Sequence, residues 1–216
     1  MKKIVCYGDS NTFGFNPKTL GRYDNSLLWT NILSKKLQDT CEVYNEGQNG
    51  RTTAFDRSDN EEANGLDSLI PILKKYRTVD LLIFMLGTND CSCELDLSID
   101  DIKNGMEKLI ITSRNYLKES QGYIPKILII VPAKILSNYK GTLFESQIND
   151  ETLVKTKSLG KPYKELADKY DCLYLDCTNE IEVTTIDCEH LTENGHNKLA
   201  ELIYNKIKNV IWLIVI

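Results

Sequence analysis

The fold is decided by Leu81-Leu82-Ile83-Phe84-Met85-Leu86, which is followed at once by Gly87-Thr88-Asn89-Asp90. Six consecutive apolar residues are typical of a strand that is buried on both faces, as in the middle of a parallel sheet. Polar side chains that follow such a strand lie at the carboxyl edge of the sheet, where open α/β sheets bind their ligands. The segment therefore predicts a central strand and a functional loop directly after it.

Similar short apolar runs recur on both sides of this segment, and helix-period segments separate them. The predicted strands cover residues 3–7, 42–45, 80–86, 126–131 and 172–176. Apolar residues at helical spacing predict helices over 28–37, over 99–117 behind a Ser98 cap, and after Thr192. Gly160 and Pro162 weaken the helical pattern around them, and residues 136–150 have no clean period and are predicted to form a long loop. Strands that alternate with helices predict a three-layer α/β/α sandwich with a five-stranded parallel sheet.

The overall composition restricts the classes of protein that the chain can belong to. With 216 residues and no repeat or linker-like stretch, residues 1–216 are expected to form a single domain. The net charge of −5 argues against nucleic acid as the main partner, because phosphate binding needs a concentrated basic face. Seven cysteines, an odd number without paired zinc-ligand spacing, suit a reducing compartment.

Both ends of the chain favour a cytoplasmic protein. Only four apolar residues, 4–7, precede Gly8, too few for the apolar region of a signal peptide. The apolar run 210–216 is far shorter than the roughly 20 residues of a membrane span. We interpret this run as a buried end or as a contact between subunits of a homo-oligomer.

A serine nucleophile with a histidine base is suggested by the two ends of the sequence. The first predicted strand ends in Gly8-Asp9-Ser10-Asn11, and the only two histidines, His190 and His196, lie in segment 187–196. A serine hydroxyl attacks an ester only when an imidazole accepts its proton and a carboxylate orients that imidazole. Asp187 stands three residues before His190, which a tight turn brings within reach, whereas His196 falls inside the last predicted helix and is expected to support the fold or face solvent.

Acyl transfer also needs hydrogen-bond donors for the oxyanion that develops on the carbonyl oxygen. Three groups at the predicted sheet edge can donate: the Ser10 backbone N–H, a glycine N–H in loop 47–53, and the Asn89 side-chain amide. Each motif alone is compatible with an ordinary turn or helix cap. Their joint occurrence at predicted strand ends is what favours a catalytic site.

In order and spacing, these segments resemble the sequence blocks of the SGNH (GDSL-type) hydrolase superfamily. Gly8-Asp9-Ser10-Asn11 looks like the first block, Gly50 with Arg51-Thr52-Thr53 the second, Gly87-Thr88-Asn89-Asp90 the third, and Asp187-x-x-His190 the fifth. Trp29-Thr30, Arg57 and a Pro71-containing helix after Asn64-Gly65 make the arylesterase/acyltransferase branch the most similar.

The resemblance implies a flavodoxin-like fold and a role for each block residue. It implies that Ser10 is the nucleophile, that His190 is the general base and acid, and that Asp187 orients the imidazole. It also implies an oxyanion hole formed by Ser10, Gly50 and Asn89. We prefer Gly50 to Gly47 because Gly50 directly precedes Arg-Thr-Thr.

Substrate contacts are expected from residues near the nucleophile: Asp9, Asn11, Phe13 and Trp29. Phe13, Phe15 and Trp29 suggest an apolar pocket, although aromatic residues at such spacing are more often part of a core. The chain departs from the family at Asn11, where many members have leucine, and at Phe13 and Phe15, which replace the tryptophans of acyltransferase-like relatives. These departures bear on substrate choice.

The sequence therefore predicts a serine esterase that hydrolyses short-chain carboxylic acyl esters without a cofactor or metal, and that transfers acyl groups to alcohols if its pocket excludes water. One alternative is a non-catalytic protein that binds a small ligand on the same α/β scaffold. A second is a metallohydrolase that uses Asp187, Cys188, Glu189, His190 and His196. Cys91 and Cys93 are interpreted as buried small side chains.

Overall fold

Five parallel strands form the central sheet in a computed structural model, which describes residues 1–38 and 40–213, the last three by their backbone only. The strands are β1 (Lys2–Gly8), β4 (Cys41–Gly47), β5 (Leu81–Met85), β6 (Lys126–Val131) and β7 (Leu173–Asp176). Their order in the sheet is β4-β1-β5-β6-β7, and every neighbouring pair is parallel. The predicted five-stranded parallel sheet is thereby confirmed.

The chain reverses its direction of travel across the sheet between β1 and β5. From β1 it crosses to β4 on one side, and it then returns past β1 to add β5, β6 and β7 on the other side. Ligands of open α/β sheets bind in the crevice that such a reversal leaves at the carboxyl ends of the strands. In this chain β1 ends at Gly8 and β5 ends at Met85, so the crevice lies where the first and third sequence blocks begin.

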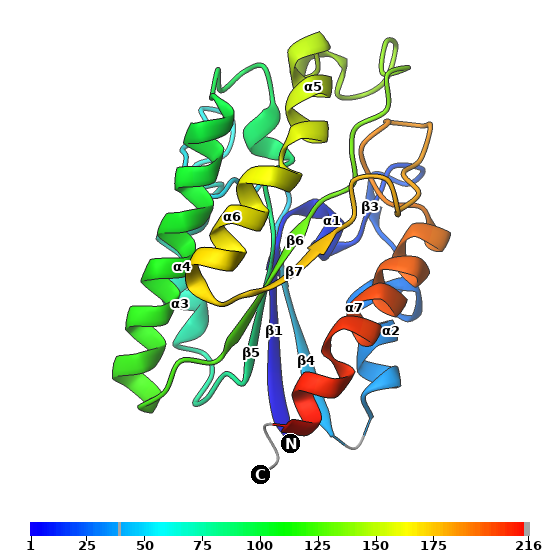
Figure 1. The fold of residues 1–216 in the computed structure, drawn as a ribbon. Helices are drawn as coiled ribbons and strands as arrows, with labels where there is room; N and C mark the ends of the chain where they lie inside the picture. The colour runs from blue at the N-terminus through cyan, green and yellow to red at the C-terminus, as the bar shows by residue number, and fades with distance from the viewer. Residues whose placement is uncertain (39, 214–216) are drawn as a thin grey trace.

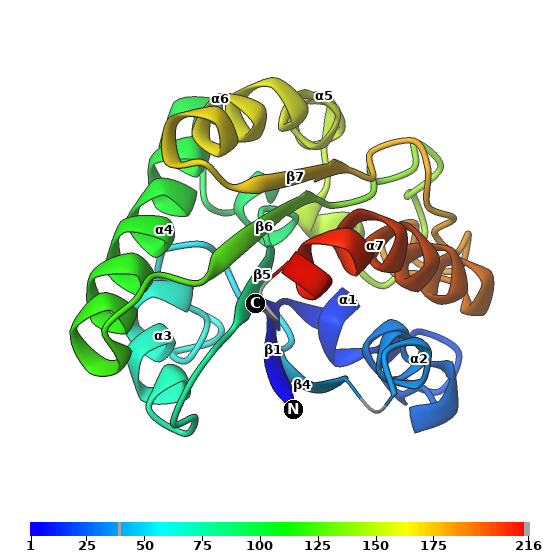
Figure 2. The same ribbon diagram turned by 60° about the horizontal axis from the view of Figure 1, so that its bottom comes forward.

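Helices cover both faces of the sheet and complete the three layers (Figures 1 and 2). One face carries α3 (Gly65–Leu73), α4 (Ile99–Gln121) and α6 (Gly160–Tyr170), and α5 (Asp150–Ser158) leads into α6. The other face carries α2 (Trp29–Lys36) and α7 (Glu193–Leu213), which pack against each other. The remaining elements are short: α1 (Ser10–Phe13), the hairpin of β2 (Phe15–Asn16) and β3 (Gly21–Arg22), and three 3-10 turns at Asn25–Leu27, Asn89–Cys91 and Glu145–Gln147.

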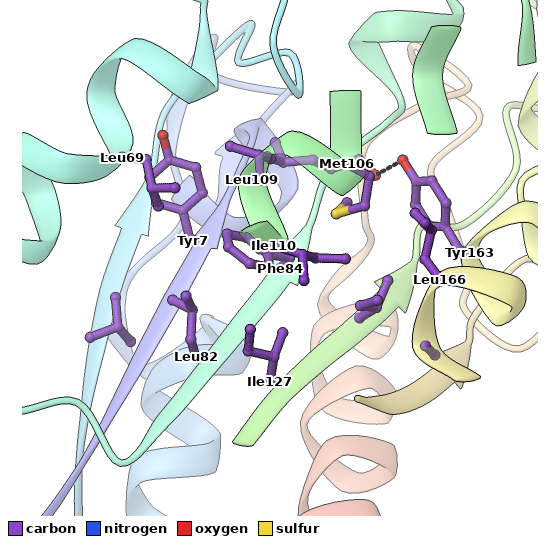
Figure 3. Packing of buried hydrophobic residues seen from close by; sticks show 14 of the residues in the cluster. Tyr7, Leu69, Leu82, Phe84, Met106, Leu109, Ile110, Ile127, Tyr163 and Leu166 are labelled. Carbon is purple, nitrogen blue, oxygen red and sulfur yellow. Dashed lines mark hydrogen bonds between the residues drawn. The ribbon is translucent and has the colours of Figure 1, made fainter. Parts of the chain in front are cut away.

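The two hydrophobic cores follow from the alternation of side chains along the strands. On the α4 side, Tyr7 and Phe84 meet edge to face with ring centroids 5.9 Å apart, and Met106 and Ile110 pack over them (Figure 3). The other face buries Ile4, Cys6, Leu81, Ile83 and Met85 against side chains of α2 and α7. Because β5 contributes to both cores, its five residues are all buried, as the unbroken apolar run predicts.

Differences from the predicted elements lie at their ends and have local causes. Strand β4 runs two residues past its predicted end because Glu46 and Gly47 stay paired with Tyr7 and Gly8. The segment around Gly160 forms two helices, α5 and α6. Proline is tolerated at position 162 because it lies in the first turn of α6, where a backbone N–H has no acceptor within the helix. Helix α5 begins at Asp150 because Asn149 forms a capping box with Thr152.

In the apolar run 210–216, residues 214–216 lie outside the described residues and residues 211–213 are described by their backbone only, so its role as a buried end or a subunit contact stays a prediction. No helix in the described part of the chain combines the length and the apolar character needed to cross a bilayer.

Candidate active site

Ser10 stands at the end of β1, on a sharp turn into the short helix α1. Asp9 caps this helix by accepting a hydrogen bond from the Asn11 backbone N–H at 2.9 Å. Because Ser10 is the first residue of α1, its own N–H has no acceptor within the helix. The turn needs glycine at position 8, since a Cβ there would lie 2.1 Å from Thr12 Oγ1.

His190 and Asp187 reach Ser10 from a tight turn that precedes α7. His190 Nε2 lies 2.7 Å from Ser10 Oγ, and His190 Nδ1 lies 2.7 Å from Asp187 Oδ2. The other Asp187 oxygen, Oδ1, accepts hydrogen bonds from the backbone N–H groups of Glu189 and His190, both at 3.1 Å. Cys188 has a φ of 68°, a left-handed conformation that is uncommon outside glycine and that closes the turn. The three expected side chains thus form one chain of hydrogen bonds.

The charges around His190 favour its protonated form. Burial lowers the pKa of His190, but the hydrogen bond to Asp187 and the negative fields of Glu189, Asp187 and Asp9 outweigh it, and the net pKa is raised. For Asp187 burial raises the pKa, yet the hydrogen bond and the charge of His190 reverse that shift and leave it lowered. Both directions describe an imidazole held ready to accept a proton beside a carboxylate that stays ionised.

A cavity of about 310 Å³ opens in front of Ser10 and His190. Its walls combine two aromatic rings with polar side chains from several loops. They are formed by Ser10, Phe15, Asn49, Gly50, Arg57, Asp59, Asn60, Asn89, Phe144, Gln147, Glu189 and His190. The rings of Phe15 and Phe144 lie 4.6 and 5.5 Å from the His190 ring, between centroids, so they shield one side of the imidazole from water.

Gly50 and Asn89 line this cavity together with Ser10. Gly50 lines the cavity with a φ of 76°, a conformation that suits glycine, and Asn89 lines it from the 3-10 turn after β5. Asn89 Nδ2 donates to the Arg51 carbonyl at 3.0 Å, which fixes the orientation of the amide. Gly47 is placed elsewhere: its N–H donates to Asn45 Oδ1 at 2.9 Å, and it packs against the Phe13 backbone.

Arg51 and Asp90 hold the three loops of the site in register. The Arg51 guanidinium lies 4.2 Å from the Tyr7 ring centroid and donates to the Gly8 carbonyl at 2.8 Å. Asp90 Oδ1 accepts from the Thr53 N–H at 3.0 Å and from Thr53 Oγ1 at 2.5 Å. These buried contacts tie the second block to the first and third blocks. In the sequence, Arg51 and Asp90 are marked only by their positions inside the second and third motifs.

Four residues that we expected to contact substrate are not among those that line this cavity. Trp29 is fully buried in the α2 core, and its Nε1 donates to the Asn11 carbonyl at 3.2 Å. Asn11 Oδ1 accepts from the Leu191 N–H at 2.9 Å, Asp9 is fully buried beneath α1, and Phe13 packs under the Arg22 guanidinium. These contacts join the turn around Ser10 to the segments that pack against it.

The residues that sequence reasoning missed come from segments without a periodic pattern. Phe144 and Gln147 belong to the predicted loop 136–150, which the Cys93 N–H holds by donating to the Gln147 carbonyl at 3.0 Å. The sequence indicates Arg57 only as a feature of the family and Glu189 only as a candidate metal ligand, and both line the cavity.

The side chains proposed as metal ligands do not converge. His196 is buried in α7 and its Nδ1 accepts from the Trp29 N–H at 3.3 Å, while His190 uses both ring nitrogens. Among the described residues, no three His, Cys, Asp or Glu side chains are grouped to hold one ion. Burial lowers the pKa of His196 to about 4, so it is a neutral part of the fold.

Comparisons with known proteins show which family and which solved structures the chain is similar to. The family model of GDSL-like lipases and acylhydrolases matches residues 4–203. A carbohydrate acetylesterase family member from Sinorhizobium meliloti is 28% identical, with a TM-score of 0.90 over 98% of this chain and 100% of that one. An aryl esterase from M. smegmatis is also 28% identical, with a TM-score of 0.88 over 97% of this chain and 99% of that one. A comparison with curated protein sequences gave no match.

Proposed function

The chain belongs to the family of GDSL-like lipases and acylhydrolases and is a carboxylic-ester hydrolase, and we propose that Ser10, His190 and Asp187 are its catalytic triad. The observation that carries this proposal is the continuous contact from Ser10 Oγ through both nitrogens of His190 to Asp187 Oδ2, with 2.7 Å at each step. A non-catalytic binding protein has no need of this arrangement beside an open cavity.

In the proposed first half-reaction, His190 Nε2 takes the proton of Ser10 Oγ while that oxygen attacks the ester carbonyl carbon. The carbonyl oxygen becomes an oxyanion, which the N–H groups of Ser10 and Gly50 and the Asn89 amide stabilise. The tetrahedral intermediate then collapses. Its bond to the alcohol oxygen breaks, His190 gives its proton to that oxygen, and the acyl group stays on Ser10.

In the second half-reaction a water molecule takes the place of the alcohol. His190 accepts a proton from this water, the hydroxide adds to the acyl carbon, and the Ser10 oxygen leaves with the proton from His190. An alcohol that enters instead of water completes an acyl transfer. The two phenylalanine rings beside His190 support transfer because they reduce the access of water to the imidazole.

We propose that the acyl group is short. The cavity of about 310 Å³ lies at the small end of the range for ligand pockets, which begins at roughly 300 Å³. One of the similar solved structures is that of a carbohydrate acetylesterase, which its name assigns to acetyl esters.

Covalent labelling tests the proposal against the non-catalytic alternative. A fluorophosphonate reacts with a serine only when that serine is activated by a base. We expect one equivalent to add to Ser10, located by peptide mass spectrometry, and turnover of p-nitrophenyl acetate to stop at the same stoichiometry. Labelling elsewhere, or full turnover after Ser10 is blocked, would contradict the proposal.

Asn89→Ala is expected to lower kcat for p-nitrophenyl acetate by roughly 10²- to 10³-fold, because one oxyanion donor is lost. Steady-state kinetics should show this loss in kcat with a much smaller change in KM, since the donor acts mainly in the transition state. Asn104→Ala on the exposed surface of α4 is the control. An equal decrease in kcat in both variants, or an increase in KM without a decrease in kcat, would show that Asn89 is not an oxyanion donor.

A further inference from the structure

Ser10 and His190 lie 180 residues apart in the sequence and on two different turns. Ser10 stands on the turn into α1, and His190 stands on the turn that precedes α7. The proposed proton transfer needs Ser10 Oγ and His190 Nε2 to stay in contact, at 2.7 Å. A displacement of about 1 Å between reacting groups can lower a rate by about 100-fold. Contacts that fix the two turns to each other therefore bear directly on the rate.

The side chain of Asn11 makes such contacts. Asn11 directly follows the nucleophile, and its amide group lies against the backbone on both sides of His190. Asn11 Oδ1 accepts from the Leu191 N–H at 2.9 Å, and Asn11 Nδ2 donates to the Glu189 carbonyl in a longer contact of 3.5 Å. Within residues 1–38 and 40–213, these are the hydrogen bonds that join α1 to segment 187–191 apart from that of Ser10 itself.

The turn that carries His190 is held on its other sides by backbone hydrogen bonds. The Thr184 N–H donates to the His190 carbonyl at 2.8 Å, and the Leu136 N–H donates to the Cys188 carbonyl at 2.9 Å. Neither of these contacts involves α1. They fix the shape of the turn, whereas the side chain of Asn11 fixes its distance from the nucleophile.

Asn11 is itself held in place by a second path to the same end of the chain. Its backbone N–H donates to Asp9 Oδ1 at 2.9 Å, and its carbonyl accepts from Trp29 Nε1 at 3.2 Å. The Trp29 N–H in turn donates to His196 Nδ1 at 3.3 Å, and His196 belongs to α7. Because α7 directly follows the turn of His190, Asn11 is connected to both ends of that junction.

We propose, on the basis of the proposed triad, that Asn11 is a positioning residue that keeps the imidazole of His190 within reach of Ser10. Asn11 is not among the residues that line the cavity in front of Ser10, so it acts on the alignment of nucleophile and base and leaves substrate binding to other residues. Because it holds the backbone before and after His190, its loss frees the base to move away from Ser10 Oγ.

Leucine is the replacement that isolates this role. It has as many side-chain heavy atoms as asparagine but neither a donor nor an acceptor. Asn11 also borders a gap of about 10 Å³ whose walls include Met85, Ile181 and Leu199, so a leucine meets apolar neighbours there. The variant is therefore expected to fold while the Leu191 N–H loses its acceptor.

The test measures the rate constant and the stoichiometry of fluorophosphonate labelling at Ser10 as separate quantities. We expect Asn11→Leu to take up one equivalent of label, because it folds and keeps Ser10. Its second-order rate constant should fall by roughly 10- to 100-fold, because the base is misaligned. The kcat for p-nitrophenyl acetate should fall by a similar factor with little change in KM. Asn11→Ala serves as the test if the leucine variant does not fold.

Asn45→Ala is the matched control, because Asn45 also holds α1 through its side-chain amide. Asn45 Nδ2 donates to the Thr12 carbonyl at 2.7 Å, and the other hydrogen bonds of this side chain go to Thr30 and Gly47. The control thus loosens α1 on the side of β4, away from the turn that precedes α7. Its labelling rate constant should equal that of the unmodified enzyme.

Three results would overturn the proposal. The first is an unchanged labelling rate constant and kcat in Asn11→Leu. The second is a lower stoichiometry with an unchanged rate constant, which would mean only that fewer molecules fold. The third is an equal decrease of the rate constant in Asn45→Ala, which would mean that any loosening of α1 has the same effect. A failure to label Ser10 in the unmodified enzyme would instead refute the proposed triad, so the two failures are distinguishable.

Discussion

Ser10→Ala is expected to lower kcat for p-nitrophenyl acetate by about 10⁶-fold, the loss that follows removal of the nucleophile from a triad of this kind. The reason is that Ser10 Oγ, at 2.7 Å, is the one hydroxyl hydrogen-bonded to His190 Nε2 among residues 1–38 and 40–213. Activity that remains would come from water activated by His190 and from the oxyanion donors. Burst and steady-state kinetics with active-site titration measure the loss.

The control for Ser10→Ala is Ser26→Ala, which removes an exposed hydroxyl that donates to Asp24. This variant should keep full turnover. Circular dichroism should show that both variants fold, since alanine at position 10 removes one oxygen from the edge of an open cavity. A Ser10→Ala enzyme with a tenth or more of the original kcat would exclude Ser10 as the nucleophile.

The sequence predicts the fold, and it predicts that the motifs lie close together in space. Both predictions follow from the order and direction of the strands. The run ending at Met85 is apolar on both faces, and β1 ends two residues before Ser10. In a parallel sheet all carboxyl ends share one edge, so Gly8, Gly47 and Met85 come together whatever the connecting helices do. The proximity of Asp187 and His190 is likewise a property of a short turn.

The cavity wall could not be predicted in the same way. Phe144 reaches His190 from a loop with no periodic pattern, and its position depends on tertiary contacts such as that between Cys93 and Gln147. The sequence also gives no sign that Asn11 and Trp29 hold other parts of the chain: Asn11 Oδ1 accepts from the Leu191 N–H, and Trp29 Nε1 donates to the Asn11 carbonyl. Arg57 and Glu189 line the cavity from two separate loops, and no local rule encodes the distance between them.

Asp187→Asn is expected to lower kcat by about 10⁴-fold, because the imidazole is left in the wrong tautomer. Asp187 uses Oδ1 for the N–H groups of Glu189 and His190 and Oδ2 for His190 Nδ1. Asparagine keeps the backbone contacts only if its oxygen takes the Oδ1 place, and its NH₂ group then faces Nδ1. In that arrangement Nδ1 must accept a hydrogen bond, the ring proton moves to Nε2, and Nε2 can no longer take the proton of Ser10.

The pH profile separates this cause from a general loss of structure. His190 must be neutral to act as a base, so kcat/KM rises as pH passes its pKa, which in the unmodified enzyme lies above the ordinary histidine value. Asp187 is a main source of that increase, so the residual activity of Asp187→Asn should show its acidic limb at lower pH. Asp150→Asn, an exposed acid at the start of α5, should keep both the rate and the limb. If the acidic limb of the kcat/KM profile of Asp187→Asn stayed at the same pH or moved to higher pH, Asp187 would not be the residue that raises the pKa of His190. The loss in kcat would then need another explanation.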